Sequence, residues 1–270
     1  MIVDKKSYAK VNIGLHVLNK REDNYHNLST YFHKIDLFDD IQIEILESNE
    51  LSVNIDGNSS YLTSGLDLME KAAIVYSHNA NVKFKLNIAI TKRIPHEAGL
   101  AGGSSNAATI LQTLNEYYKY FTKEELIELS LKVGSDLAFF LFDSSAAYAL
   151  SRGEVLTSVK ACSYPIIIAK KGRVSTKAAF SQLVPERIEL SSWTTELSEW
   201  KDKYTNDFDI IQEMRKEEIF IKATKDYYNT TSGSGASQLI VFENEEQRER
   251  FIAKNEAFMT SYEVYLTKLI

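Results

Sequence analysis

Two short segments concentrate glycine in a chain that otherwise contains little of it. The 270 residues include 11 glycines, which is about 4%, whereas roughly 7% is usual. Five of them lie in residues 97–108 and 230–237, each time beside Ser and Ala. Glycine lets the backbone turn tightly or approach a ligand closely. One such segment alone would indicate a tight turn, but the two together favour anion binding.

The first glycine segment sits between a predicted strand and a predicted helix. Such a helix start offers unpaired N–H groups and a partial positive charge to a phosphate, and Ser104 and Ser105 add hydroxyls. We expect one of these serines to be the N-cap residue. The segment is neither a Walker A sequence nor GxGxxG. On the residues alone, a phosphate site and a packing turn are equally supported.

Four further side chains have both a chemical and a structural interpretation. Asp136 could accept a proton, but it also precedes an apolar run and could be a helix N-cap. Lys10 lies on the strand face opposite Val11 and Ile13, so pattern alone makes it a solvated lysine. Tyr25 and Phe180 could stack on a base, although ordinary packing explains them equally well.

Composition excludes several classes of protein. With 31 Lys and Arg against 37 Asp and Glu, the formal charge is −6, which argues against a nucleic-acid binder. The single cysteine, Cys162, cannot form an internal disulfide and fits a reducing compartment. We find no long apolar run and no apolar N-terminal region, and therefore expect a cytoplasmic protein without a membrane span or a signal peptide.

The periodicity of apolar residues predicts strands and helices in both halves, which is an α+β fold. Strands are expected over residues 9–17, 41–45, 53–55, 84–90, 165–169 and 261–270. Helices are expected over residues 67–76, 107–118, 122–133, 193–204 and 245–255. The helix at 122 opens with a Thr-x-x-Glu capping box, and both tryptophans, Trp193 and Trp200, are expected in a core.

The glycine segments also carry a family resemblance. Residues 94–108, IPHEAGLAGGSSNAA, resemble the phosphate motif of the GHMP kinase superfamily, residues 7–15 (SYAKVNIGL) resemble its first motif, and residues 232–236 (SGSGA) its third. Residues 20–28 (KREDNYHNL) and 132–140 (KVGSDLAFF) are similar to the branch that phosphorylates the 2-hydroxyl of 4-diphosphocytidyl-2-C-methyl-D-erythritol. The resemblance covers nearly the whole chain and is thin between residues 186 and 228.

The resemblance implies a two-domain GHMP kinase fold and a reaction. Residues 1–155 would form an N-terminal domain like the second domain of ribosomal protein S5, and residues 156–270 a ferredoxin-like C-terminal domain, with the active site in the cleft between them. The expected activity is ATP-dependent phosphorylation, with Mg2+, of the cytidine diphosphate sugar alcohol of non-mevalonate isoprenoid precursor synthesis. Its partners are these small molecules, and the oligomeric state is left open.

Site residues follow from the same resemblance. Asp136 would be the catalytic base, with Lys10 beside it. The expected substrate-binding residues are Asn12, Tyr25, His26, Phe180, Gly233 and Gly235. The expected ATP-binding residues are Asp67, Leu68, Lys92, Pro95, Gly99, Leu100, Ala101, Gly102, Gly103, Ser104 and Ser105, and Ser105 is also a candidate Mg2+ contact.

The chain departs from the family pattern at several glycine positions. Ala98, Ala101 and Glu97 stand where the family usually has glycine, and Asn24 replaces the turn glycine before Tyr25. A positive φ at Ala101 would cost about 1 kcal/mol, whereas Asn tolerates this conformation. These changes keep two alternatives open: a GHMP kinase for homoserine, mevalonate or a sugar, and a noncatalytic nucleotide-binding module.

Overall fold

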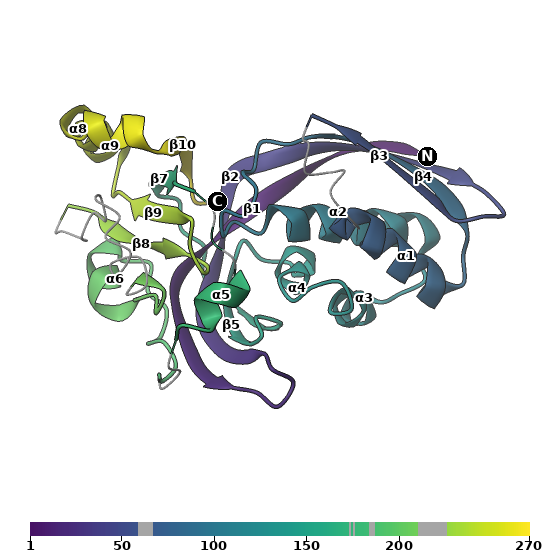
Figure 1. The fold of residues 1–270 in the computed structure, drawn as a ribbon, viewed down its shortest axis with the longest axis horizontal. Helices are drawn as coiled ribbons and strands as arrows, with labels where there is room; N and C mark the ends of the chain where they lie inside the picture. Colours follow the sequence, from purple (N-terminus) through teal and green to yellow (C-terminus); the bar gives the residue numbers. More distant parts are fainter. Residues whose placement is uncertain (59–66, 173, 175, 184–186, 210–225) are drawn as a thin grey trace. The chain divides into compact units, whose positions relative to one another are not determined.

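The computed structural model describes residues 1–58, 67–172, 174, 176–183, 187–209 and 226–270 (Figure 1). Its contacts divide the chain into two compact units whose segments alternate along the sequence. The first unit comprises Met1–Ala9, Leu37–His96 and Ala101–Asp143. The second comprises Lys10–Asp36, Glu97–Leu100 and Ser144–Ile270. The predicted boundary between residues 155 and 156 stays a prediction.

The first unit packs helices against one side of a group of strands (Figure 1). The later part of β2 (His26–Glu47) pairs antiparallel with β4 (Phe84–Thr91), which pairs parallel with β3 (Ser52–Gly57). Alternate strand residues such as Ile41, Ile43 and Ile45 are buried, because successive side chains of a strand face opposite sides. The helices are α1 (Leu68–Ala80), α2 (Gly102–Tyr118), α3 (Lys123–Ser130) and α4 (Leu137–Leu141).

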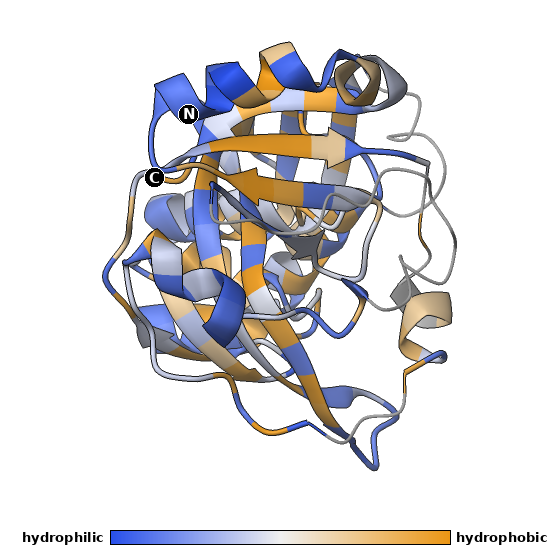
Figure 2. Ribbon diagram, turned by 90° about the vertical axis from the view of Figure 1, so that its left-hand side faces the viewer, coloured by the Kyte–Doolittle hydropathy of each residue, from blue (hydrophilic) through white to orange (hydrophobic). Residues whose placement is uncertain are grey.

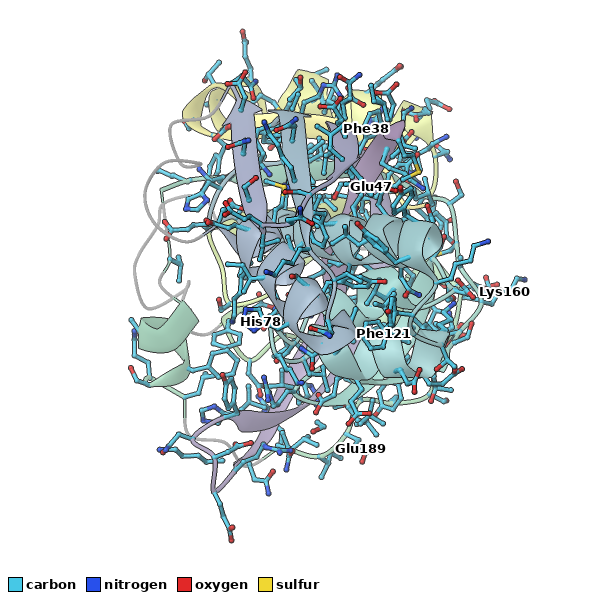
Figure 3. All side chains as sticks on the ribbon, turned by 90° about the vertical axis from the view of Figure 1, so that its right-hand side faces the viewer. Phe38, Glu47, His78, Phe121, Lys160 and Glu189 are labelled. Atoms are coloured by element: carbon cyan, nitrogen blue, oxygen red, sulfur yellow. The ribbon has the colours of Figure 1, made fainter. Side chains whose placement is uncertain are left out.

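Local sequence signals fix two of these helices. Helix α3 has the expected capping box: the Thr122 hydroxyl accepts from the Glu125 N–H, and the Glu125 carboxylate accepts from the Thr122 N–H. Helix α1 is capped by Asp67, whose carboxylate accepts from the Met69 N–H at 2.7 Å. Its buried Tyr76 meets Phe121 edge-on, with the ring centroids 5.3 Å apart. Phe121 is labelled in Figure 3.

The second unit contains two groups of strands. The later part of β1 (Ile2–Lys20) belongs to it, and the first part of β2 pairs antiparallel with β5 (Ala146–Ser151), which pairs with β6 (Val155–Ser158). A four-stranded antiparallel sheet has the order β10-β7-β9-β8. Its strands are β7 (Pro165–Lys170), β8 (Tyr228–Ser232), β9 (Ser237–Val241) and β10 (Glu263–Lys268).

Four helices accompany these strands in the described residues of the second unit. They are α5 (Thr176–Phe180), α6 (Leu197–Lys203), α8 (Glu245–Lys254) and α9 (Glu256–Ser261). Helix α8 is the expected charged helix, and most of it is hydrophilic in Figure 2. Among the described residues, no helix is long and apolar enough to cross a membrane.

The tryptophan region is only partly as expected. Trp200 is fully buried, and the rings of Trp193 and Trp200 lie 5.4 Å apart. Trp200 is therefore in a core as predicted, whereas Trp193 packs against it but is only partly buried. Helix α6, however, starts at Leu197 rather than near residue 193. Trp193 lies before it and donates from Nε1 to the Lys160 carbonyl, so its spacing reflects packing and not helical periodicity.

Candidate active site

Helix α2 begins immediately after a left-handed residue in the first unit. Ala101 is the N-cap, with φ 54° and ψ 31° and no side-chain cap hydrogen bond. The expectation that Ser104 or Ser105 caps this helix is therefore wrong, because the turn at Ala101 starts the helix at Gly102. Ser105 is buried inside the helix, where its hydroxyl donates to the Tyr8 carbonyl and accepts from the Ser7 hydroxyl.

A buried carboxylate holds the chain that leads into this turn. Asp39 is fully buried and accepts from the backbone N–H groups of Arg93 at 2.7 Å and Ile94 at 2.9 Å. It also forms an ion pair with the Lys92 ammonium group. The Lys92 Nζ lies 3.5 Å from the position that a Cβ would take on Gly102. The Lys92–Asp39 ion pair thus lies beside the positive end of the α2 dipole, and this helix end favours an anion.

The first two glycines of α2 differ in what surrounds them. A Cβ on Gly102 would lie 2.8 Å from the Ile94 Cγ2 atom, so no larger residue fits without a shift. Gly103 is exposed, and a Cβ there would meet Leu68 Cδ1 at 3.5 Å. The structure therefore brings together four predicted ATP-binding residues of the first unit. The carboxylate of a fifth, Asp67, is already used as the cap of α1.

Asp136 occupies the N-cap position of α4 but does not cap the helix with its side chain. It has helical φ and ψ of −68° and −16° and no side-chain cap hydrogen bond. It is half-buried, whereas Leu137, Ala138 and Phe139 behind it are buried. The interpretation of Asp136 as a capping residue is therefore not supported. Asp136 lies in the first unit and Lys10 in the second, and their pairing stays a prediction.

Lys10 and Asn12 form a buried polar pair in the second unit. Their exposed fractions are 4% and 1%, so the interpretation of Lys10 as a solvated lysine is wrong. The Lys10 Nζ donates to Asn12 Oδ1 at 2.7 Å and lies 4.8 Å from the centre of the Phe32 ring. Asn12 Nδ2 donates to the Thr30 hydroxyl at 2.8 Å. Burying an ammonium group is costly unless polar partners surround it. A buried lysine with such partners is typical of functional sites.

The two glycine segments meet beside this pair. The Lys10 N–H donates to the Leu100 carbonyl at 3.1 Å. The Ser232 hydroxyl donates to the Gly99 carbonyl at 3.1 Å. A Cβ on Gly233 would lie 3.2 Å from Gly99 O and 3.6 Å from Asn12 Oδ1. Thus parts of all three motifs on which the family resemblance rests lie side by side within one unit.

The predicted cytosine-reading residues form an aromatic group in the same unit. The rings of His26 and Phe180 are stacked, with centroids 5.0 Å apart and planes 24° apart. Burial, and then the charge of Lys20, lowers the pKa of His26, so the imidazole is neutral at neutral pH and can both donate and accept. Tyr25 is 52% exposed. The guanidinium carbon of Arg152 lies 3.9 Å from the centre of its ring.

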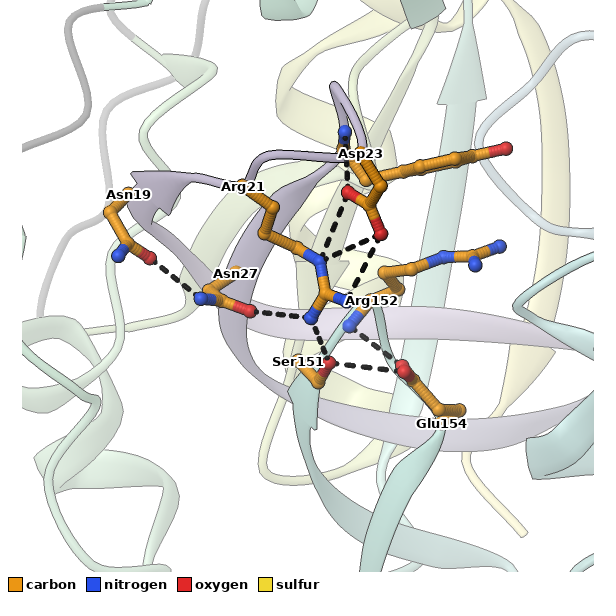
Figure 4. Close-up of polar contacts among 8 residues, drawn as sticks. Asn19, Arg21, Asp23, Asn27, Ser151, Arg152 and Glu154 are labelled. Carbon is orange, nitrogen blue, oxygen red and sulfur yellow. Dashed lines mark hydrogen bonds and ion pairs between the residues drawn. The ribbon is translucent and has the colours of Figure 1, made fainter.

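Hydrogen bonds and ion pairs fix the turn that carries Tyr25 (Figure 4). Arg21 forms an ion pair with Asp23 and donates from Nη1 to the Ser151 hydroxyl at 2.8 Å. Asp23 accepts from the Tyr25 N–H at 3.0 Å. Asn24 has φ 65°, the left-handed conformation expected where the family has glycine. The turn that carries Tyr25 is therefore hydrogen-bonded although the Tyr25 side chain is exposed.

Sequence reasoning missed a buried turn at residues 206–209. Asn206, Asp207 and Phe208 are almost fully buried, and Asn206 donates to the carbonyls of Thr231 and Gly233. The segment has no glycine cluster and no clear periodicity. It also lies where the family resemblance is thin, so its sequence gave no signal of this role.

Comparisons with known proteins agree with this geometry. Residues 66–144 match the family of GHMP kinases N terminal domain. A crystal structure of 4-(cytidine 5'-diphospho)-2C-methyl-D-erythritol kinase superposes with a TM-score of 0.76 at 26% identity, covering 99% of both chains. This chain therefore has the GHMP kinase fold and carries a segment similar to the N-terminal domain of GHMP kinases. A homoserine kinase from Cytophaga hutchinsonii shares the GHMP kinase fold, with a TM-score of 0.69 at 13% identity over 100% and 97% of the two chains.

Sequence relatives of this chain share one name. The 4-diphosphocytidyl-2-C-methyl-D-erythritol kinase of Clostridium perfringens is 37% identical over 182 residues, which are 66% of this chain and 62% of that protein. The protein of the same name from Francisella tularensis is 40% identical over 178 residues, 65% of this chain and 64% of the relative. The matches thus span less than two thirds of these curated relatives. The predicted resemblance to GHMP kinases is confirmed over residues 66–144, and the predicted α+β GHMP kinase fold is confirmed by the superposition.

Proposed function

We propose that this protein is the ATP-dependent kinase that phosphorylates the 2-hydroxyl of 4-diphosphocytidyl-2-C-methyl-D-erythritol in the non-mevalonate pathway of isoprenoid precursor synthesis. The observation that carries the proposal is the meeting of Lys10 and Asn12 with Gly99 and Gly233 in one unit. It places a buried ammonium group beside two glycine segments whose backbones can approach phosphates. The names of the relatives support the substrate, and a cytoplasmic location is part of the proposal.

Phosphoryl transfer needs positioning and charge neutralisation more than covalent chemistry. Asp136 would accept the proton of the substrate hydroxyl, and its carboxylate is not used as a helix cap. The Lys10 ammonium would stabilise negative charge that develops on the acceptor oxygen. Asn12, whose amide is held between Lys10 and Thr30, would orient the same end of the substrate.

ATP binding would use the residues at the start of α2. Lys92 and the N–H groups of Gly102 and Gly103 would hold the phosphates, and Leu68 would contact the purine. Their surroundings fit an anion, because a cation and a helix N-terminus lie together and Gly103 is open to solvent. The other residues proposed to bind ATP are Asp67, Pro95, Gly99, Leu100, Ala101, Ser104 and Ser105.

Mg2+ would reach the protein with the nucleotide. Among the described residues, no group of three or more His, Cys, Asp or Glu side chains could hold a metal ion. The Ser105 hydroxyl, the expected Mg2+ contact, already bonds to Ser7 and Tyr8. Mg2+ commonly keeps several waters and binds mainly through substrate phosphates, where it neutralises part of their charge. The donor set of this chain fits that mode of binding.

Cytidine recognition would use the aromatic group of the second unit. Tyr25 offers an exposed ring for stacking, and the neutral His26 could pair with the polar edge of the base. Phe180 would complete the base site next to His26. Gly233 and Gly235 would approach the substrate phosphates.

The decisive test compares two aspartates at the two ends of α4. Asp136→Asn removes the proposed base, and turnover should fall by about 100- to 10,000-fold with little change in stability. Asp143→Asn is the matched control, since this carboxylate is exposed and pairs with Lys123. Near-normal turnover of Asp136→Asn would remove Asp136 as the base.

One feature favours a noncatalytic nucleotide-binding module instead. Glu97 places an exposed negative charge in the first glycine segment, where a triphosphate is expected to bind. A thermal-shift panel with ATP, CMP, mevalonate and homoserine separates the alternatives, because a ligand of the folded state raises the midpoint. Shifts with ATP and CMP support the proposal. A shift with mevalonate or homoserine points to another GHMP kinase, and a shift with ATP alone, without turnover, to the noncatalytic module.

A further inference from the structure

In the second unit, the turn at residues 206–209 is hydrogen-bonded to the start of the glycine loop, residues 232–235. Asn206 is 2% exposed and Asp207 is 6% exposed. Polar side chains this deeply buried are costly unless they are hydrogen-bonded. The partners of these side chains therefore indicate what the turn stabilises.

Asn206 uses its amide to hold the loop. Its Nδ2 donates to Thr231 O at 2.6 Å and to Gly233 O at 3.0 Å. Its Oδ1 accepts from the Phe208 N–H at 2.9 Å. Both N–H donors and the acceptor oxygen of the amide are therefore engaged. Two of these three hydrogen bonds go to Thr231, near the end of β8, and to Gly233, at the start of the loop.

The rest of the turn is anchored on β1 and β8. Asp207 accepts from the Val17 N–H at 2.8 Å, and its own N–H donates to the Leu15 carbonyl at 2.9 Å. Asp209 accepts from the Thr231 N–H at 2.8 Å. Strand β1 also carries Lys10 and Asn12. The turn therefore ties the glycine loop to the same strand that bears the buried polar pair.

The bond to Gly233 also controls the direction of the next peptide group. In a planar trans peptide the carbonyl oxygen and the following N–H point to opposite sides. With the Gly233 carbonyl held toward Asn206, the Ser234 N–H points away from the buried turn. Without that bond the peptide could rotate, since Gly233 has a left-handed φ of 59° and glycine has few steric restrictions. A carbonyl oxygen turned outward would repel a phosphate.

We propose that Asn206 is a positioning residue that fixes the glycine loop for a phosphate-bearing substrate. The identity of that substrate, the cytidine diphosphate compound, rests on the proposed function. The role of Asn206 in ordering the loop does not.

Two variants test the role. Asn206→Asp keeps the shape and the acceptor but places carboxylate oxygens against two carbonyls, whereas Asn206→Ala removes the donors together with the acceptor of the Phe208 N–H. In the ligand-free protein, hydrogen exchange of a peptide covering residues 232–237 should become at least tenfold faster in both variants, while a β7 peptide should be unchanged. With substrates, KM for the cytidine compound should rise at least tenfold and KM for ATP less than twofold.

Asn229→Ala is the matched control. Asn229 is another buried asparagine and lies on β8, and within the described part of the chain its side chain has no hydrogen-bond partner. Its loss should change neither loop exchange nor either KM. Unchanged loop exchange in folded Asn206 variants would overturn the proposal, and so would variants that do not fold, because they would assign Asn206 to global stability. If the wild-type protein transfers no phosphate, the proposed function fails, and the exchange data still decide the role of Asn206.

Discussion

Gly99 and Ser232 are in direct backbone contact although they lie 133 residues apart in the sequence. The Ser232 hydroxyl donates to the Gly99 carbonyl, and a Cβ on Gly99 would lie only 2.1 Å from the Ser232 carbonyl oxygen. Gly99 also has a left-handed φ of 74°. Glycine is therefore required here both by the conformation and by the approach of a second chain segment.

Gly99→Ala should be far more damaging than the same change at Gly172. Gly172 has a similar φ of 68°, but an added Cβ would meet no atom of the residues that the structure describes within 4 Å. We expect Gly172→Ala to cost about 1 kcal/mol in the free energy of unfolding, and Gly99→Ala about 3 kcal/mol or more, since overpacking adds to the left-handed strain. Urea denaturation measures both. Equal losses would show that the backbone approach has no energetic role.

Ala101→Gly should stabilise the protein. Ala101 has φ 54° at the N-cap of α2, and glycine adopts this conformation without strain. We expect a gain of about 1 kcal/mol in the free energy of unfolding. Ala98→Gly is the control, because Ala98 is buried and is not among the residues with positive φ. That variant should lose stability, and a gain in both would refute the explanation by strain.

Arg152→Ala should weaken binding of the cytidine substrate if the proposed function holds. The guanidinium group lies over the Tyr25 ring, and such a contact contributes about 0.5–1 kcal/mol at an exposed site. KM for the cytidine compound should rise by about two- to fivefold, with KM for ATP unchanged. Arg152→Lys keeps a cation there and should restore most of the affinity. Equal KM values for all three proteins would exclude this contribution.

The stability of the protein should fall as the pH is lowered from about 6.5 to about 4. Burial lowers the pKa of His33 from 6.5 to about 4, while its Nε2 accepts from the Cys162 N–H at 3.1 Å. Between these values the unfolded chain binds a proton that the folded chain does not, so acid favours unfolding. At about 1.4 kcal/mol per pH unit, the loss in the free energy of unfolding over this range is about 3 kcal/mol.

Urea denaturation at pH 7.0, 5.5 and 4.5 checks this effect. His33→Gln removes the titrating group, so its free energy of unfolding should depend less on pH than that of the wild-type protein, even if it is lower at pH 7. Parallel pH profiles for the two proteins would show that His33 is not responsible.

Elements specified by nearby residues could be predicted from the sequence. The capping box of α3 and the alternation of β4 need only contacts within a few residues, and both are present. The start of α2 could not be predicted in the same way. It depends on the conformation of Ala101 and on Asp39, which holds Ile94 from 55 residues away. Propensity favours serine as a cap, but the tertiary anchor moves the helix start by several residues.

Site residues that lie in a family motif could be predicted from the sequence. Properties that depend on contacts with distant segments could not. The alternation of β1 put Lys10 opposite the apolar face, yet residues 9–13 are all buried because both faces of this part of the strand are covered. Asn206 has its partners 25 and 27 residues further on. Neither property can be obtained from periodicity, because each depends on which segments the fold brings together.

The alternation of the two units along the chain has a consequence for biosynthesis. The polypeptide passes between them at residues 9–10, 36–37, 96–97, 100–101 and 143–144. The stretch from Lys10 to Asp36 leaves the ribosome early but belongs with residues 144–270, which are translated much later. Apolar side chains in this stretch, such as Val11 and Ile13, therefore stay exposed to solvent until residues 144–270 have been synthesised and can pack with it. We therefore expect the nascent polypeptide to depend on chaperones, and a fragment ending near residue 155 to aggregate.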